Sequence, residues 1–272
     1  MKVTILGSGC TAGTPKPGCN CKNCSWSRKN GFERKRFTAL VESKGRKLLV
    51  DAGPDLRAQM LNHGINPQEI DVILITHLHY DHCSGLNEFR LKEAKKVYTI
   101  PDAASTIKKE NQHLGQCLEI EPKELMSPFE ACGFNIVFFD AKHGIPCAGI
   151  MIEAEGKKVV FLPDSRLELD EDAEELIREA DLMLIDAYTE NETQIREVLS
   201  DFFTQERIEL EFKENSVTHG IISKAKELSK RLKVKSTEAV HLSHRVRPHP
   251  KLVKDYEDEC FKIGFDGKQI EL

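Results

Sequence analysis

Thr76-His77-Leu78-His79-Tyr80-Asp81-His82 places three histidines and an aspartate within six positions, in the pattern H-x-H-x-D-H. It follows residues 70–75, an apolar run rich in β-branched side chains, which predicts a buried strand. In an extended chain His77 and His79 point to the same side, so both can bind one metal ion. Asp81 and His82 are adjacent, point in different directions and suit a second ion. The stretch therefore predicts part of a two-metal site at a strand end, where ligands collect in α/β proteins.

Further residues of metal-binding type follow other strand-like runs, and this repetition carries the prediction. They are His143 after residues 134–139, Asp164 after 158–163, Asp186 after 182–185 and His241 after 239–240. An aspartate after a strand is commonly a turn former or a helix N-cap, and for Asp186 both interpretations stay open. His63 and His113 lack such a context and are expected at the surface. His249, between two prolines, has no evident role.

Taken together, these motifs resemble the metallo-β-lactamase superfamily, as do the segments 2–9 and 47–53. The resemblance covers essentially the whole chain. It implies an α/β fold, a four-layer αββα sandwich of two packed mixed sheets flanked by helices. It also implies the ligand sets: one ion would take His77, His79 and His143, the other would take Asp81, His82 and His241, and Asp164 would bridge both. Asp51 and Asp186 would support these ligands from behind, with Asp51 holding a ligand histidine in place.

A second cluster, residues 19–24, has the pattern C-x-C-x2-C formed by Cys19, Cys21 and Cys24. Three thiolates so close repel one another unless a cation holds them, and zinc binds each sulfur at about 2.3 Å. His244 is the best fourth ligand, because its odd spacing from His241 puts the two side chains on opposite faces of an extended segment. A redox-active or free-thiol loop is the alternative. A structural zinc here would form a knuckle that joins residues 19–24 to the carboxy-terminal segment.

The knuckle narrows the resemblance within the superfamily. Together with H-x-H-x-D-H it is similar to the PhnP-type phosphodiesterases, and also to the pyrroloquinoline-quinone accessory proteins. The ribonuclease Z branch shares the catalytic ligands but usually lacks the knuckle. His219 precedes a predicted helix that runs to about Leu232, and free N–H groups at a helix start suit a phosphate oxygen. The resemblance implies that His219 donates a proton to the scissile phosphate; the alternative is a capping or packing histidine.

These residues predict a metal-dependent hydrolase, with Asp81 and His219 as its catalytic residues and two divalent ions, Zn, Mn or Fe, beside the structural Zn. Two such ions lower the pKa of a bridging water, so that hydroxide forms at neutral pH and can attack a linear or cyclic phosphodiester. The first alternative is a ribonuclease Z-like endonuclease that processes tRNA. The second is hydrolysis of a thioester or lactam. The third is an accessory metal-binding protein without hydrolase activity.

Composition limits the partners. The net charge is −5, and the basic runs are short, residues 28–36 and 231–235, so nucleic acid is not the favoured substrate. We expect residues 25–36 to form a solvated basic loop, although a surface that guides anions is the alternative. Nine cysteines without a signal-like segment predict the cytoplasm, and the sequence shows no long apolar segment for a membrane. The chain is expected to form one domain, 1–272, and a homodimer.

Two helical regions complete the expectations. Residues 167–180 predict an acidic helix with a solvated face. Residues 188–215 resemble an insertion with a helix through Phe203, which would act as a lid or as a dimer contact.

Overall fold

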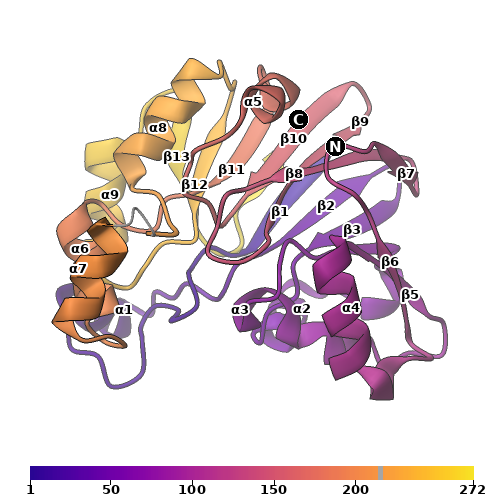
Figure 1. The fold of residues 1–272 in the computed structure, drawn as a ribbon, viewed down its shortest axis with the longest axis horizontal. Coiled ribbons are helices and arrows are strands. Elements are labelled where there is room, and N and C mark those ends of the chain that lie inside the picture. The colour runs from indigo at the N-terminus through magenta and orange to yellow at the C-terminus, as the bar shows by residue number, and fades with distance from the viewer. Residues whose placement is uncertain (214–216) are drawn as a thin grey trace.

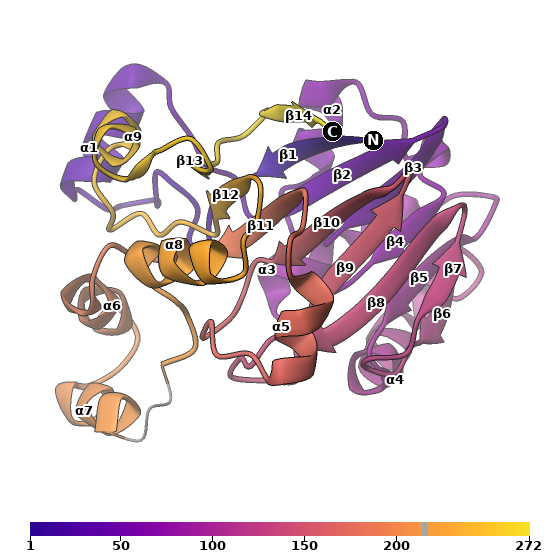
Figure 2. The same ribbon diagram turned by 90° about the horizontal axis from the view of Figure 1, so that it is seen from above.

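Two seven-stranded sheets pack face to face, and helices cover the outer face of each (Figures 1 and 2). The computed structural model describes residues 1–213 and 217–272. In spatial order, the first sheet contains β14 (Gln269–Glu271), β1 (Lys2–Gly7), β2 (Thr38–Ser43), β3 (Arg46–Val50), β4 (Val72–Leu74), β5 (Lys95–Thr99) and β6 (Leu118–Pro122). The second contains β13 (Phe261–Ile263), β12 (Thr237–Val240), β11 (Leu182–Asp186), β10 (Lys157–Leu162), β9 (Ala148–Ala154), β8 (Phe134–Asp140) and β7 (Phe129–Ala131). The expected αββα sandwich of two mixed sheets is confirmed.

The helices form the outer layers and one end of the sandwich (Figures 1 and 2). Beside the first sheet lie α2 (Leu56–His63), α3 (Tyr80–Cys83) and α4 (Pro101–Glu110). Beside the second lie α5 (Glu171–Ile177), α8 (Ile222–Arg231) and α9 (His249–Tyr256). At one end lie α1 (Lys22–Asn30), α6 (Glu192–Leu199) and α7 (Gln205–Lys213). Short 3-10 segments are η1 (Pro67–Glu69), η2 (Ser84–Phe89) and η3 (Gln112–Leu114). No helix among the described residues is long and apolar enough to cross a membrane.

Strand β10 shows why the sequence builds this sandwich. Val159 and Phe161 lie in the core between the two sheets, whereas Val160 and Leu162 lie under the outer helices. Successive side chains of a strand point to opposite faces, and here both faces are covered. The strand is therefore apolar at nearly every position instead of alternating with polar residues.

The parallel strands bring the predicted site to one edge. In the second sheet β10, β11 and β12 are parallel, and β8 runs the same way because β9 is antiparallel to both β8 and β10. In the first sheet β3 and β4 are parallel. Ligands collect at the carboxyl ends of such strands. The residues at or after these ends are Asp51, residues 77–82, His143, Asp164, Asp186 (the last residue of β11) and His241.

The expectation of a solvated basic loop at residues 25–36 holds only in part: Arg28 and Lys29 are exposed, but the segment is partly helical and Arg34 is buried. The segment begins inside α1, which ends at Gly31 in the left-handed conformation that glycine permits. Arg34 is only 2% exposed, and its Nη1 donates a hydrogen bond of 2.7 Å to Ser8 Oγ. Its Nη2 lies 2.9 Å from His249 Nδ1, which gives that histidine a role that the sequence did not show. A buried guanidinium requires such partners.

Two helix expectations also need correction. The acidic helix covers only Glu171–Ile177, because the Asp170 side chain accepts a hydrogen bond from Ala173 N and caps its start. In the 188–215 stretch the helix does not continue through Phe203: α6 ends at Leu199, and α7 forms a second helix. Residues 214 and 215 of this stretch lie outside the described residues.

Candidate functional site

Three histidine nitrogens from two sheets converge on one point. His79 Nδ1 lies 2.9 Å from His77 Nε2 and 3.1 Å from His143 Nε2. Two ligand atoms about 2.1 Å from a shared ion are separated by roughly 3.0–3.4 Å, so this spacing fits one metal ion. Burial lowers the pKa of His79 to about 4 and that of His143 to about 2. Both rings are therefore neutral at neutral pH, the form that binds metal.

Asp81, His82 and His241 form a second buried group beside the first. Asp81 Oδ2 lies 3.4 Å from His82 Nε2 and 3.5 Å from His241 Nε2. The buried His82 Nε2 has no hydrogen-bond partner within residues 1–213 and 217–272. Burial lowers the pKa of His82, but the carboxylates of Asp164 and Asp51 outweigh it and raise this pKa well above its usual value. Such a cluster of acids around an unpartnered imidazole nitrogen fits a divalent cation.

Asp164 touches both groups. Its Oδ2 lies 3.3 Å from His77 Nε2 and 3.4 Å from His82 Nε2, and its Oδ1 lies 3.0 Å from His241 Nε2. Asp164 Oδ1 has no partner with hydrogen-bond geometry among the described residues. Asp164 thus occupies the position that a carboxylate bridging two ions requires.

Asp51 supports this arrangement from beneath. Its Oδ2 lies 2.7 Å from His82 Nδ1, and its Oδ1 accepts hydrogen bonds from Thr76 N at 2.8 Å and Thr76 Oγ1 at 3.0 Å. Thr76 Oγ1 in turn lies 2.9 Å from His77 Nδ1. One carboxylate therefore orients a histidine of each group, directly and through Thr76. Asp51 and His241 both adopt positive φ angles, 61° and 56°, a left-handed conformation that is uncommon for non-glycine residues.

His219 lies over the two groups and is held by Asp186. His219 Nδ1 is 2.8 Å from Asp186 Oδ2, which also accepts a hydrogen bond from Ser165 N at 3.0 Å. Burial raises the pKa of Asp186 above its usual value, and contact with His219 opposes this shift. The His219 ring is stacked on His241 with centroids 5.0 Å apart. This arrangement leaves Nδ1 engaged with Asp186 and fixes the orientation of the ring.

Thr76 and Tyr188 belong to the site but were not found from the sequence. Tyr188 stacks on the His219 ring, with the two ring centroids 4.3 Å apart and the ring planes 19° apart. Burial raises the pKa of the Tyr188 hydroxyl well above its usual value, and the nearby Cys10 and Asp186 add smaller contributions in the same direction. The hydroxyl therefore keeps its proton. The only local signal is position, since Thr76 precedes the metal-binding stretch and Tyr188 follows Asp186 by two residues.

The knuckle residues also come together. His244 Nδ1 lies 3.5, 3.8 and 3.6 Å from the sulfurs of Cys19, Cys21 and Cys24. A tetrahedral zinc with bonds of about 2.3 Å to sulfur and 2.05 Å to nitrogen separates these atoms by about 3.6 Å. Burial, with a contribution from Cys21, raises the pKa of Cys24 to about 12 against an opposing hydrogen bond from Lys16. The three thiols would therefore not ionise together without a cation, and the residues fit zinc.

The insertion is tied to this knuckle through Asp201, in the turn between α6 and α7. Asp201 accepts hydrogen bonds from Lys16 Nζ at 2.6 Å and Arg245 Nη2 at 2.9 Å. Its Oδ2 also lies 3.9 Å from His244 Nε2. The knuckle thus connects the amino-terminal loop, the helical insertion and the carboxy-terminal segment.

Solved structures with this fold cover the full chain. A diphosphatase from the PhnP family is 24% identical and superposes with a TM-score of 0.81 over 100% of this chain and 97% of that chain. Zn²⁺-bound PqqB from Methylobacterium extorquens is 22% identical, with a TM-score of 0.82 over 100% of both chains. At these identities the similarity shows the fold.

Sequence comparison finds relatives of different activities. The octanoyltransferase of Porphyromonas gingivalis is 27% identical over 181 residues, covering 61% of this chain and 35% of that protein. Ribonuclease Z of Agathobacter rectalis is 31% identical over 131 residues, covering 43% of each. The matched region thus spans between a third and a half of these curated relatives. The family model described as a beta-lactamase superfamily domain matches residues 46–244. Because this match covers most of the chain and the two-sheet sandwich agrees with it, the chain belongs to the metallo-β-lactamase superfamily.

Proposed function

We propose that this protein is a metal-dependent phosphodiesterase that acts on a small linear or cyclic phosphodiester. The observation that carries the proposal is the position of Asp164 between two groups of histidines, with His219 held over both by Asp186. Superfamily membership supports a metal-dependent hydrolase. The proposal goes further to phosphorus chemistry, because an oriented acid is needed to protonate an alkoxide leaving group.

We assign His77, His79 and His143 to one ion and Asp81, His82 and His241 to the other, with Asp164 shared. The donor atoms of His77, His79, His143 and Asp164 lie within 4.8 Å of one another, and so do those of Asp81, His82 and His241. Mixed imidazole and carboxylate ligands suit Zn, Mn or Fe. Two such ions, when bound, would supply an activated water and positive charge for the phosphate oxygens. We further propose a structural Zn on Cys19, Cys21, Cys24 and His244, so the loaded chain would hold three ions.

The protein's own residues complete the reaction. Hydrolysis forms a bond between the water oxygen and phosphorus and breaks the bond between phosphorus and the leaving oxygen. That oxygen takes a proton from His219, whose orientation Asp186 fixes, and the proton released by water restores the balance. Burial raises the pKa of Asp81, but His82 and His241 outweigh burial and hold it below the usual range. The ionised Asp81 is the group that we propose orients the attacking water.

A ribonuclease Z-like activity is the second candidate, because the chain is 31% identical to a ribonuclease Z over part of its length. Of the basic residues in the run 28–36, only Arg28 and Lys29 are exposed. Arg34 is buried, Lys35 pairs with Glu33, and Arg36 Nη1 lies 3.1 Å from Asp55. A free stripe of cations, which RNA backbone binding requires, is thus not formed by these side chains.

We also propose that residues 1–272 act as one domain and that the protein forms a homodimer in the cytoplasm. Ligands from both sheets share the site, which supports a single domain. Phe202, Phe203 and Leu210 of the insertion are 64%, 47% and 45% exposed, which supports a contact with a second copy or a closing lid. The cysteines are all free, as a reducing compartment requires.

Turnover of bis(p-nitrophenyl) phosphate tests the proposal. The protein should hydrolyse it when loaded with Zn, Mn or Ni and lose this activity after chelation. tRNA precursors and an octanoyl thioester serve as competing substrates in parallel. Absence of diester hydrolysis with every metal, or a strong preference for either competitor, would refute it.

A further inference from the structure

A small cleft opens directly beside His219. Its volume is about 210 Å³, and three segments line it: the loop after β10, the α6–α7 insertion and the start of α8. Typical ligand pockets measure roughly 300–1,000 Å³, so this cleft holds about one ring and not a nucleic acid strand. Its position next to the proposed acid places it on the side from which the leaving group departs.

One wall of the cleft is apolar. It includes Ile195 from α6, Phe212 from α7 and Ile221 before α8. Ile195 is 3% exposed, and the guanidinium of Arg196 lies 3.8 Å from the ring centroid of Phe212, which fixes that ring. The wall therefore suits the flat or apolar body of a leaving group.

The cleft also contains two cations, Arg166 and Lys224. The buried Nε of Arg166 has no hydrogen-bond partner in the described parts of the chain, residues 1–213 and 217–272. Elsewhere on α8, the Nζ atoms of Lys226 and Lys230 lie 2.9 and 3.7 Å from Asp258 Oδ2. Lys224 forms no ion pair with any residue of 1–213 and 217–272. A buried donor without a partner is costly unless a ligand supplies one. The acids of the cleft, Glu168 and Glu192, are exposed.

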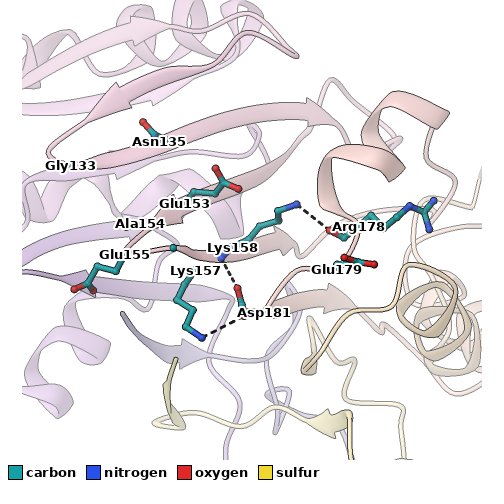
Figure 3. Close-up of a pocket in the computed structure, with 11 residues that line it drawn as sticks. Gly133, Asn135, Glu153, Ala154, Glu155, Lys157, Lys158, Arg178, Glu179 and Asp181 are labelled. Carbon is teal, nitrogen blue, oxygen red and sulfur yellow. Dashed lines mark hydrogen bonds and ion pairs between the residues drawn. The ribbon is translucent and has the colours of Figure 1, made fainter.

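A larger hollow, shown in Figure 3, also contains cations, but its lysines have partners within the protein. It lies at the other end of β10 and has a volume of about 540 Å³. There Lys157 Nζ lies 3.6 Å from Asp181. Lys158 Nζ donates to the carbonyl oxygens of Leu176 and Arg178 at 3.0 and 3.1 Å. These lysines are already engaged within the protein, so the hollow does not call for an anion.

We propose that the cleft beside His219 is the leaving-group subsite, and that Arg166 and Lys224 select a leaving group of about one ring that carries its own anionic group. The inference rests on the proposed function, because the His219 acid defines which side the leaving group occupies. It narrows the substrate to phosphodiesters whose leaving group carries a second negative charge. Arg166 and Lys224 are specificity-determining residues and take no part in proton transfer.

The test uses two diesters that differ only in leaving-group charge: methyl p-nitrophenyl phosphate and its m-carboxy-p-nitrophenyl counterpart. The metal-loaded wild-type protein should favour the carboxylated diester in kcat/KM. Arg166→Gln and Lys224→Gln should each reduce this preference roughly three- to tenfold, the contribution of one partly exposed charged contact. The lower kcat/KM for the carboxylated diester should come from a higher KM, with kcat unchanged. Comparing each variant with the wild type cancels the difference in intrinsic reactivity between the two esters.

Lys230→Gln is the matched control, since Lys230 lies on the same helix with its side chain 66% exposed. It should leave the preference unchanged. Glu192→Gln removes an acid of the cleft and should increase the preference. Lys224 is exposed, so its variant tests the idea even where Arg166→Gln impairs folding. Equal losses on both diesters, or no change in any variant, would overturn the subsite while leaving the phosphodiesterase assignment intact. Failure of the wild type to hydrolyse either diester would overturn both.

Discussion

Replacing His244 by alanine should release the structural zinc and spare the two ions at the active site. The His244 ring is 1% exposed, and its Nδ1 lies 3.5–3.8 Å from the three knuckle sulfurs. Its pKa is lowered to about 4 by burial and by Arg245, so the ring is neutral at pH 7. The substitution removes a ready ligand without removing any residue assigned to the active site.

The size of the effect follows from the number of ligands. A structural zinc contributes about 10–16 kcal/mol of binding free energy at neutral pH. If four ligands share this equally, the loss of one costs roughly 2.5–4 kcal/mol, before water takes the vacant position. Since about 1.4 kcal/mol is a tenfold change in affinity, zinc should bind the knuckle roughly 10²–10³-fold more weakly.

Metal content after dialysis against chelators of increasing strength measures this change. The wild type should retain three equivalents per chain, and the variant should lose one first, with three additional thiols becoming reactive. His241→Ala is the matched control three residues away, and it should weaken the other ions while the knuckle thiols stay protected. A wild type with two or fewer equivalents and freely titrating knuckle thiols would refute the structural zinc.

Three further predictions concern the site and the buried cation. Asp186→Asn should lower kcat roughly a hundredfold or more with metal content unchanged, because His219 loses the carboxylate that orients it; the loss should be larger for phenyl than for p-nitrophenyl diesters, and equal losses would exclude a role in protonation. His249 has its pKa lowered to about 4 by burial and by Arg34, so between about pH 6.5 and pH 4 the folded state binds fewer protons than the unfolded state, and the free energy of unfolding falls as the pH drops through this range. Between pH 7 and pH 5 the wild type should lose about 1 kcal/mol more stability than His249→Gln in urea unfolding, after allowance for partial exposure; parallel pH curves would contradict this. Removal of all metals should lower Tm, and restoring Zn at 100 times its Kd should recover about 2.7 kcal/mol per site; an unchanged Tm would show that the residues do not bind metal.

The sequence was informative wherever chemistry is encoded by local spacing. The pattern H-x-H-x-D-H sets the directions of four side chains within six residues, and the structure brings these side chains together. The cysteine cluster at 19–24 is equally local. Apolar runs that end in potential ligands predicted buried strands, and β10 and β11 are buried on both faces. Superfamily resemblance then supplied the order of the layers.

Tertiary structure decided what depends on register and packing between distant segments. The contact of His79 with His143 spans 64 residues, and that of Asp81 with His241 spans 160. Neither strand spacing nor composition fixes such distances. Packing also placed Tyr188 on His219 and buried Arg34 within a run that looked solvated.

The stretch from His77 to His82 therefore predicted a metallo-β-lactamase-like group of metal-ligand residues, as far as ligand type and local geometry can determine it. The cleft beside His219 could not be predicted, because its walls come from three segments that meet only after the sheets pack. Side-chain direction is a property of a few consecutive residues, whereas a cavity is a property of the space left between elements.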